Sequence, residues 1–98
     1  MSRATRWRSM PASRLSLREW DGDFVAYNPL SGDTHVLDVV SGETLKRLMA
    51  GSVSEEELSA QIASFLEVHD DMRLTESVRR ILANLDELGL AEPIEECA

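Results

Sequence analysis

The segment of residues 34–51 changes from a strand pattern to a helix pattern within a few positions, which narrows the folds open to the chain. Its first four residues are rich in β-branched side chains and favour an extended strand. In its second half, leucine and methionine recur at the spacing of a buried helical face. Ser41 is the predicted N-cap, because its hydroxyl can accept a hydrogen bond from the first turn, and Gly51 is the predicted left-handed C-cap. The sequence therefore predicts a strand that leads into a helix over residues 41–50.

Upstream of this segment, the sequence predicts a β-hairpin. Residues 13–20 alternate apolar and polar side chains, as a half-buried strand does. Asp21-Gly22 supplies the positive φ angles of a two-residue turn, and residues 23–28 make the returning strand. A turn of this length places Trp20 opposite Asp23.

A third strand follows at residues 34–37, after the turn-forming residues 29–33. The three strands are predicted to form an antiparallel sheet whose edges carry unpaired backbone groups.

After the first helix, Ser54 and Glu57 have the spacing of a capping box, and the helix that they begin is predicted to reach about Glu67.

A last helix, from about Thr75 to a stop at Gly89, has the broadest apolar face. The predicted fold class is therefore α+β: a three-stranded antiparallel sheet followed by three helices, with the element inventory of a winged helix-turn-helix domain. The folded domain is predicted to span residues 13–90, between a flexible basic tail at 1–12 and an acidic tail at 91–98.

The 98 residues suffice for one modest core and contain no apolar run of the length that a bilayer requires. No secretory signal is recognisable at the basic N-terminus, so a cytoplasmic location and no membrane association are expected.

No convincing catalytic or metal site is found in the sequence. His35 lies near Asp33 and two serines, but neither serine has the setting of a catalytic nucleophile. Residues 69–71 (His-Asp-Asp) lack the spacing that places two metal ligands on one helical face. The glycines are isolated and form no phosphate cradle. We therefore expect no enzymatic activity, no cofactor and no metal.

Charge argues against nucleic-acid binding, although the winged-helix layout suggests it. The net charge is −8, and residues 21–98 hold five basic residues against seventeen acidic ones. Arg79 and Arg80 on the last helix could imitate a recognition helix, but a strongly acidic body repels phosphates. A nucleic-acid-binding or regulatory winged helix is therefore kept as the second interpretation, and no nucleic-acid partner is expected.

The exposed third strand suggests an interaction module instead. An extended peptide could add to the sheet along Thr34, His35, Val36 and Leu37, with backbone hydrogen bonds supplying sequence-tolerant affinity. Pockets between this strand and the last helix would supply selectivity. The candidate lining residues are Val78, Ile81 and Leu82, with Arg79 placed to engage an acidic ligand residue. For Val78 and Ile81, plain core packing is the alternative, and homodimerisation through the same sheet edge is a third interpretation.

Three pieces of the sequence carry a resemblance to a known family. They are residues 20–38 (Trp-Asp-Gly-Asp-Phe-Val-Ala-Tyr-Asn-Pro-Leu-Ser-Gly-Asp-Thr-His-Val-Leu-Asp), residues 41–45 (Ser-Gly-Glu-Thr-Leu) and residues 78–90, which end in Leu-Gly-Leu. Together they resemble the PqqD family of peptide chaperones. More narrowly, Tyr27-Asn28 and residues 31–35 (Ser-Gly-Asp-Thr-His) resemble the branch found beside an HPr kinase-related protein.

The resemblance covers residues 13–90 and implies a non-enzymatic recognition element. Such an element binds the leader segment of a ribosomally made precursor peptide and presents it to modifying enzymes, with an HPr kinase-related protein as one implied partner. In the family, the leader pairs with the third strand and lies against the third helix, here residues 34–37 and the face containing Val78 and Leu82. One departure is Ser41-Gly42, where family members commonly have a pair of alanines or serines.

Overall fold

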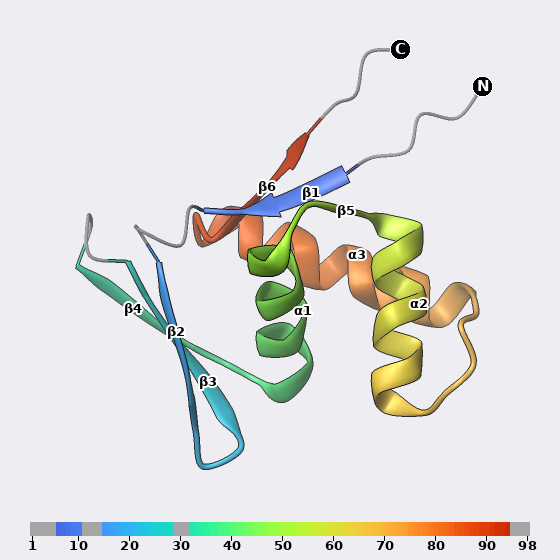
Figure 1. The fold of residues 1–98 in the computed structure, drawn as a ribbon, viewed down its shortest axis with the longest axis horizontal. Coiled ribbons are helices and arrows are strands. Elements are labelled where there is room, and N and C mark those ends of the chain that lie inside the picture. Colours follow the sequence, from blue (N-terminus) through green and yellow to red (C-terminus); the bar gives the residue numbers. More distant parts are fainter. Residues whose placement is uncertain (1–5, 11–14, 29–31, 95–98) are drawn as a thin grey trace.

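Two small antiparallel sheets and three helices make up the fold (Figure 1). The computed structural model describes residues 6–10, 15–28 and 32–94. In chain order, the elements are β1 (Arg6–Ser9), β2 (Ser16–Trp20), β3 (Asp23–Asn28), β4 (Asp33–Leu37), α1 (Val39–Ala50), β5 (Val53–Ser54), α2 (Glu55–Leu66), α3 (Met72–Glu87) and β6 (Ala91–Ile94). One sheet has the strand order β2-β3-β4 and the other has the order β5-β1-β6.

The β2–β3 hairpin has the predicted turn and register. Asp21 and Gly22 both have positive φ angles, 52° and 89°, and Trp20 pairs with Asp23. This is the backbone geometry of a type I′ turn, which aspartate and glycine favour. Strand β2 begins at Ser16, later than predicted, and residues 13 and 14 lie outside the described residues.

The third strand, β4, pairs with β3 as predicted. Phe24 lies opposite Leu37, and the Gly32 N–H donates to the Asn28 carbonyl at 2.8 Å beside the connecting turn. The prediction of a three-stranded antiparallel sheet followed by three helices is therefore confirmed.

Helix α1 begins earlier than predicted and has a different cap. The carboxylate of Asp38 accepts from the Ser41 N–H at 2.7 Å, so Asp38 is the N-cap and Ser41 lies inside the helix. The carboxylate of a residue directly after the strand caps as well as a hydroxyl does, which the sequence pattern did not distinguish. The predicted left-handed cap is also wrong, because Gly51 has a φ of 161°, which is extended backbone.

The other two helices are capped by side chains from the residue before them. Ser54 accepts from the Glu57 N–H at 3.1 Å, which is half of the predicted capping box. The Glu57 carboxylate instead lies 3.7 Å from Arg6 of β1. Helix α3 begins at Met72, ahead of the predicted start, because the Asp71 carboxylate accepts from the Leu74 N–H at 3.0 Å.

The predicted tails are wrong for the residues that the structure describes there. Strand β1 pairs antiparallel with both β6 and β5, and its Trp7 side chain is 7% exposed and belongs to the core. The Arg8 guanidinium forms an ion pair with Glu92 of β6. The folded unit therefore extends beyond residues 13–90 at both ends, while residues 1–5 and 95–98 lie outside the described part.

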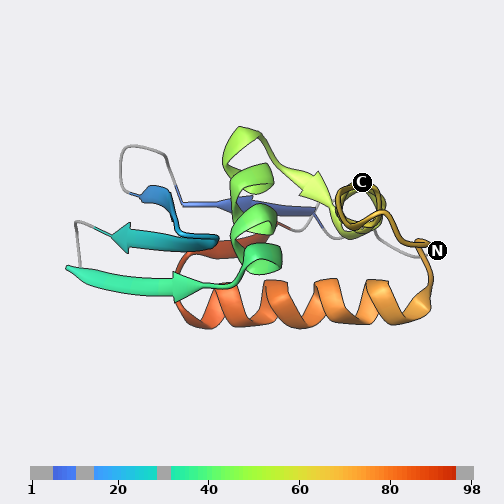
Figure 2. The ribbon, with the colours of Figure 1, turned by 90° about the horizontal axis from the view of Figure 1, so that it is seen from below.

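The core lies where α1 meets the sheets and the other helices. In Figure 2, α1 crosses between the β2-β3-β4 sheet and α2, and α3 runs beneath α1 and α2. Gly42 of α1 packs directly against Phe24 of β3, and a Cβ built on Gly42 would lie 2.0 Å from a ring carbon. No helix in the described residues combines the length and apolar character that crossing a membrane requires. The fully buried side chains include Leu45, Leu58, Ile62, Val78, Leu82, Leu85 and Leu90.

Candidate peptide-binding edge

Strand β4 is the last strand of its sheet, and β3 is its one strand partner among the described residues. In Figure 2 the three strands lie in the order β2, β3, β4, and β4 is the strand next to α3. The free edge of β4 therefore faces the side of the molecule on which α3 lies. An unpaired edge in this position is a template for another extended chain.

The hairpin geometry decides which backbone groups of β4 face outward. In a two-residue type I′ hairpin, the pair beside the turn exchanges both hydrogen bonds, and successive residues then face alternate neighbours. Because Trp20 and Asp23 are that pair, Ala26 of β3 directs its N–H and C=O groups toward β4, where His35 is its partner. The N–H and C=O groups of Thr34 and Val36 therefore point away from β3, toward the free edge.

The side chains of β4 divide between two faces of the sheet. His35 is half-buried and Leu37 is 4% exposed, so both lie on the inner face with the core. Thr34 and Val36 lie on the outer face, where Val36 is 71% exposed. The four predicted residues thus lie on one strand. The side chains of Thr34 and Val36 lie on the outer face, whereas those of His35 and Leu37 lie on the inner face.

The predicted residues on α3 also fall into two groups, one buried in the core and one partly buried at its margin. Val78 and Leu82 are 1% and 0% exposed and belong to the core, so they offer a peptide almost no surface. Ile81 is only partly buried and packs at the margin of the core. At the three-to-four spacing of a helix, Leu88 shares the flank of Ile81, and it too is partly buried. The accessible apolar surface of α3 beside the core is therefore this flank rather than the predicted pocket.

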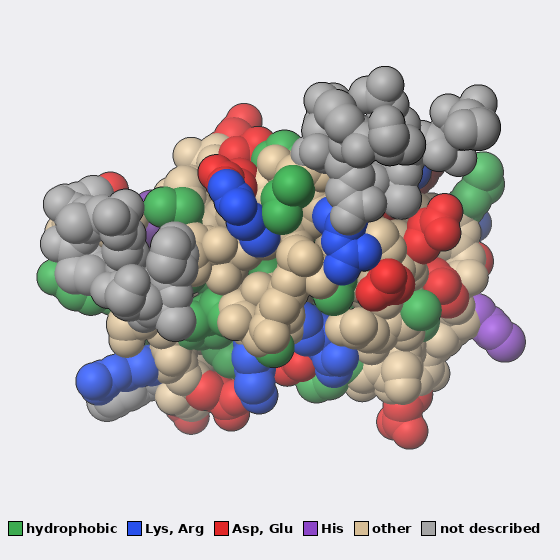
Figure 3. All heavy atoms as spheres, turned by 45° about the horizontal axis from the view of Figure 1, so that its top comes forward, with side chains coloured by type: hydrophobic (Ala, Val, Ile, Leu, Met, Phe, Trp, Pro, Cys, Tyr) green, Lys and Arg blue, Asp and Glu red, His purple; other side chains and the backbone are tan. Residues whose placement is uncertain are grey.

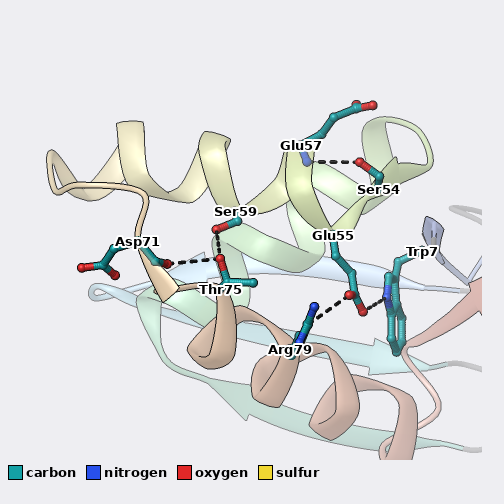
Figure 4. Close-up of polar contacts among 8 residues, drawn as sticks. All are labelled: Trp7, Ser54, Glu55, Glu57, Ser59, Asp71, Thr75 and Arg79. Atoms are coloured by element: carbon teal, nitrogen blue, oxygen red, sulfur yellow. Dashed lines mark hydrogen bonds and ion pairs between the residues drawn. The ribbon is translucent and has the colours of Figure 1, made fainter. Parts of the chain in front are cut away.

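Arg79 lies on another flank of α3 and already has a partner (Figure 4). Its Nε lies 3.2 Å from a carboxylate oxygen of Glu55, the first residue of α2. The other Glu55 oxygen accepts from Trp7 Nε1 at 3.0 Å. Glu55 therefore links β1, α2 and α3, and Arg79 contributes to this link.

Replacing Glu55 with alanine is expected to lower the free energy of unfolding by about 1–3 kcal/mol, because the half-buried indole N–H of Trp7 loses a charged acceptor. Urea unfolding followed by far-UV circular dichroism measures the loss. Glu56→Ala is the matched control, since Glu56 is exposed in the same helical turn and loses the same helix-dipole interaction. Equal losses in the two variants would mean that the link through Glu55 adds nothing.

Among the described residues on the face shown in Figure 3, the basic side chains do not gather into a surface suited to phosphate. On the face shown in Figure 3, Lys and Arg side chains are scattered among acidic and neutral ones. Arg47 pairs with Glu43 at 2.9 Å, as Arg79 does with Glu55. A hollow of about 350 Å³ between α2 and α3 has four acidic lining residues, including Glu56 and Glu76, and one basic lining residue, Arg79. Within the described part of the chain, no cluster of three His, Cys, Asp or Glu side chains has metal-binding geometry.

Comparison with known proteins identifies the fold. TbiB1 in complex with the TbiA(beta) leader peptide aligns with a TM-score of 0.70 and 20% sequence identity, covering 89% of this chain and 100% of that one. Lasso peptide synthetase B1, complexed with the leader peptide, aligns with a TM-score of 0.69 and 23% identity, covering 89% and 98%. No family model and no curated protein matches the chain. The chain therefore has the α+β fold of these two proteins.

Proposed function

We propose that this protein binds an extended peptide by strand addition to the free edge of β4, and that the peptide is the leader segment of a ribosomally made precursor. The observation that carries the proposal is the outward direction of the Thr34 and Val36 backbone groups on an edge strand. The shared fold supports the choice of ligand, because both similar structures hold a leader peptide.

Hydrogen bonds between backbone groups alone are too weak to give tight peptide binding at this edge. Thr34 and Val36 offer four outward groups, and each hydrogen bond contributes a net of about 0.5–1.5 kcal/mol. Association costs about 4–15 kcal/mol in lost translational and rotational freedom. Side-chain contacts must therefore contribute much of the affinity, and the site must select among peptide sequences.

In this proposal the protein is a non-enzymatic chaperone in the manner of the PqqD family. It presents the bound leader to peptide-modifying enzymes, and the resemblance of residues 27–35 suggests an HPr kinase-related protein as a partner. The proposed peptide contacts are the edge residues 34–37 and Ile81 of α3. Val78 and Leu82 support these contacts from within the core, and Arg79 contacts the peptide only if its pairing with Glu55 is exchanged.

A titration of labelled protein with a leader peptide encoded beside its gene tests the proposal. The amide resonances of Thr34 and Val36 are expected to shift most, together with those around Ile81, because hydrogen bonding changes directly at the outward N–H groups. Nuclear magnetic resonance spectroscopy reports each amide separately. If neighbouring leaders bind but shift only amides away from β4 and α3, strand addition at this edge is wrong.

A salt series separates this function from nucleic-acid binding. Strand addition is expected to change little in affinity between low and high salt, whereas binding to a phosphate backbone weakens steeply.

Homodimerisation through the same edge is measured by light scattering over a concentration range. A peptide that dissociates a dimer would show that both ligands compete for β4.

A further inference from the structure

We infer that the bound strand is selected on the outer face of the β2-β3-β4 sheet, by Val36 and Tyr27. The peptide then carries a β-branched residue opposite Val36 and an aromatic residue opposite Thr34. This inference rests on the proposed function, since it requires a strand at the β4 edge. It assigns the sequence preference to the face of the sheet that points away from the core.

The exposure of the two sheet faces motivates this assignment. On the outer face, Val36 is 71% exposed and Tyr27 is 42% exposed. On the inner face, Leu37 and Phe24 are 4% and 6% exposed, so their surface is already used by the core. Val36 therefore leaves apolar surface uncovered beside a strand edge that can pair with another chain. A strand added at this edge would cover it.

The register of the sheet places the peptide side chains. An antiparallel neighbour forms hydrogen-bonded pairs with the two residues whose backbone groups face it, here Thr34 and Val36. The residues directly opposite them carry their side chains on the same, outer face. Because β-branched side chains pack well against their neighbours on a pleated surface, Val36 favours a β-branched partner.

Tyr27 extends the contact across the sheet. It is the β3 partner of Thr34, so Tyr27, Thr34 and the peptide residue opposite Thr34 form one row on the outer face. Neighbouring strands lie about 4.8 Å apart, and two spacings separate Tyr27 from the peptide. Thr34 has a short side chain, so an aromatic side chain on the peptide can reach over it to the tyrosine ring.

The direction of the strand fixes the order of the two preferred residues. An antiparallel peptide extends the existing meander and runs opposite to β4. It therefore meets Val36 before Thr34, so the β-branched residue lies two positions N-terminal to the aromatic one. The residue between them faces the inner side of the sheet, toward His35.

An array of short synthetic peptides tests this pattern. The host peptide has a valine–threonine–tyrosine core between serine and glycine flanks, and the valine and tyrosine positions are each varied over every natural amino acid. With the unaltered protein, β-branched residues at the first position and aromatic residues at the second are expected to bind about two- to fivefold more tightly than serine. Fluorescence anisotropy measures each affinity.

Two surface variants connect each preference to its residue. Val36→Ser should abolish the preference at the first position only, and Tyr27→Ser the preference at the second only. Both side chains are exposed, so circular dichroism is expected to show unchanged folds. If peptides bind and shift the Thr34 amide but both preferences survive in these variants, the inference is overturned and strand addition stands. If no peptide perturbs β4, the proposed function and the inference both fail.

Discussion

Replacing Thr34 with proline is expected to weaken the binding of an extended peptide by about tenfold or more, while the protein stays folded. The Thr34 N–H faces the free edge, so proline removes a donor that only the incoming strand uses. The proline ring also occupies space at the edge, which adds a steric cost to the lost hydrogen bond. A loss of about 1.4 kcal/mol in binding free energy corresponds to the tenfold change. Titration calorimetry with the leader peptide measures it.

The neighbouring residue provides the matched control. The His35 N–H faces Ala26 of β3, so His35→Pro breaks the ladder inside the sheet and leaves the carbonyl of a fully buried residue without its donor. This variant is expected to lose about 1–3 kcal/mol of unfolding free energy. If Thr34→Pro destabilises the fold as much as His35→Pro, or binds the peptide normally, the assignment of outward groups on β4 is wrong.

Replacing Gly42 with alanine is expected to destabilise the fold by about 1–3 kcal/mol. Alanine is normally the better helix former by about 0.5–1 kcal/mol, so an uncrowded site would gain stability. Here the new Cβ would lie 2.0 Å from one ring carbon of Phe24 and 2.1 Å from another. The overlap outweighs the helical gain because α1 or the β3 strand must move. Urea unfolding gives the free-energy difference.

A second substitution isolates the cause of this effect. In a Phe24→Ala background the ring and its Cγ atom are gone and only the Cβ atom of residue 24, at 2.5 Å, stays close, so Gly42→Ala is expected to cost less than it does alone. The two changes are therefore non-additive, as expected for residues in contact. An equal penalty in both backgrounds would show that the contact with Phe24 does not explain the glycine.

Strands β2, β3 and β4 and the three helices could largely be predicted from local chemistry. The Asp21-Gly22 turn set the register of β2 and β3, because few residue pairs accept two positive φ angles. Helix starts were less certain, since Asp38 and Ser41 are both suitable caps and only the backbone geometry distinguishes them. The β1–β6 pairing could not be predicted, because it joins short segments with no shared pattern from opposite ends of the sequence.

The sequence predicted which strand forms the candidate site, but it did not predict which backbone groups of that strand face outward. Residues 34–37 were identified because an edge strand follows from a three-stranded sheet. Which of them face outward depends on the hydrogen-bonded pair at a distant turn. Periodicity also placed Val78 and Leu82 on an apolar face, but periodicity does not tell a groove from a core, and both are buried. Tyr27, which we propose as a further contact, was not among the predicted residues, although its alternation with Ala26 along the strand is compatible with an outer position.

The pairing of β1 with β6 has a consequence for the order in which the structure can form. Trp7 joins the core through a strand whose longest partner is the last strand described, and their pairing closes a loop of almost the whole domain. Closing so long a loop carries an entropic cost that the neighbouring strands β2, β3 and β4 do not share. During synthesis on a ribosome, β1 therefore completes its pairing only after β6 has been made, although it can pair with β5 earlier. The β2-β3-β4 sheet can assemble while the chain is still being made, and the core is completed only afterwards.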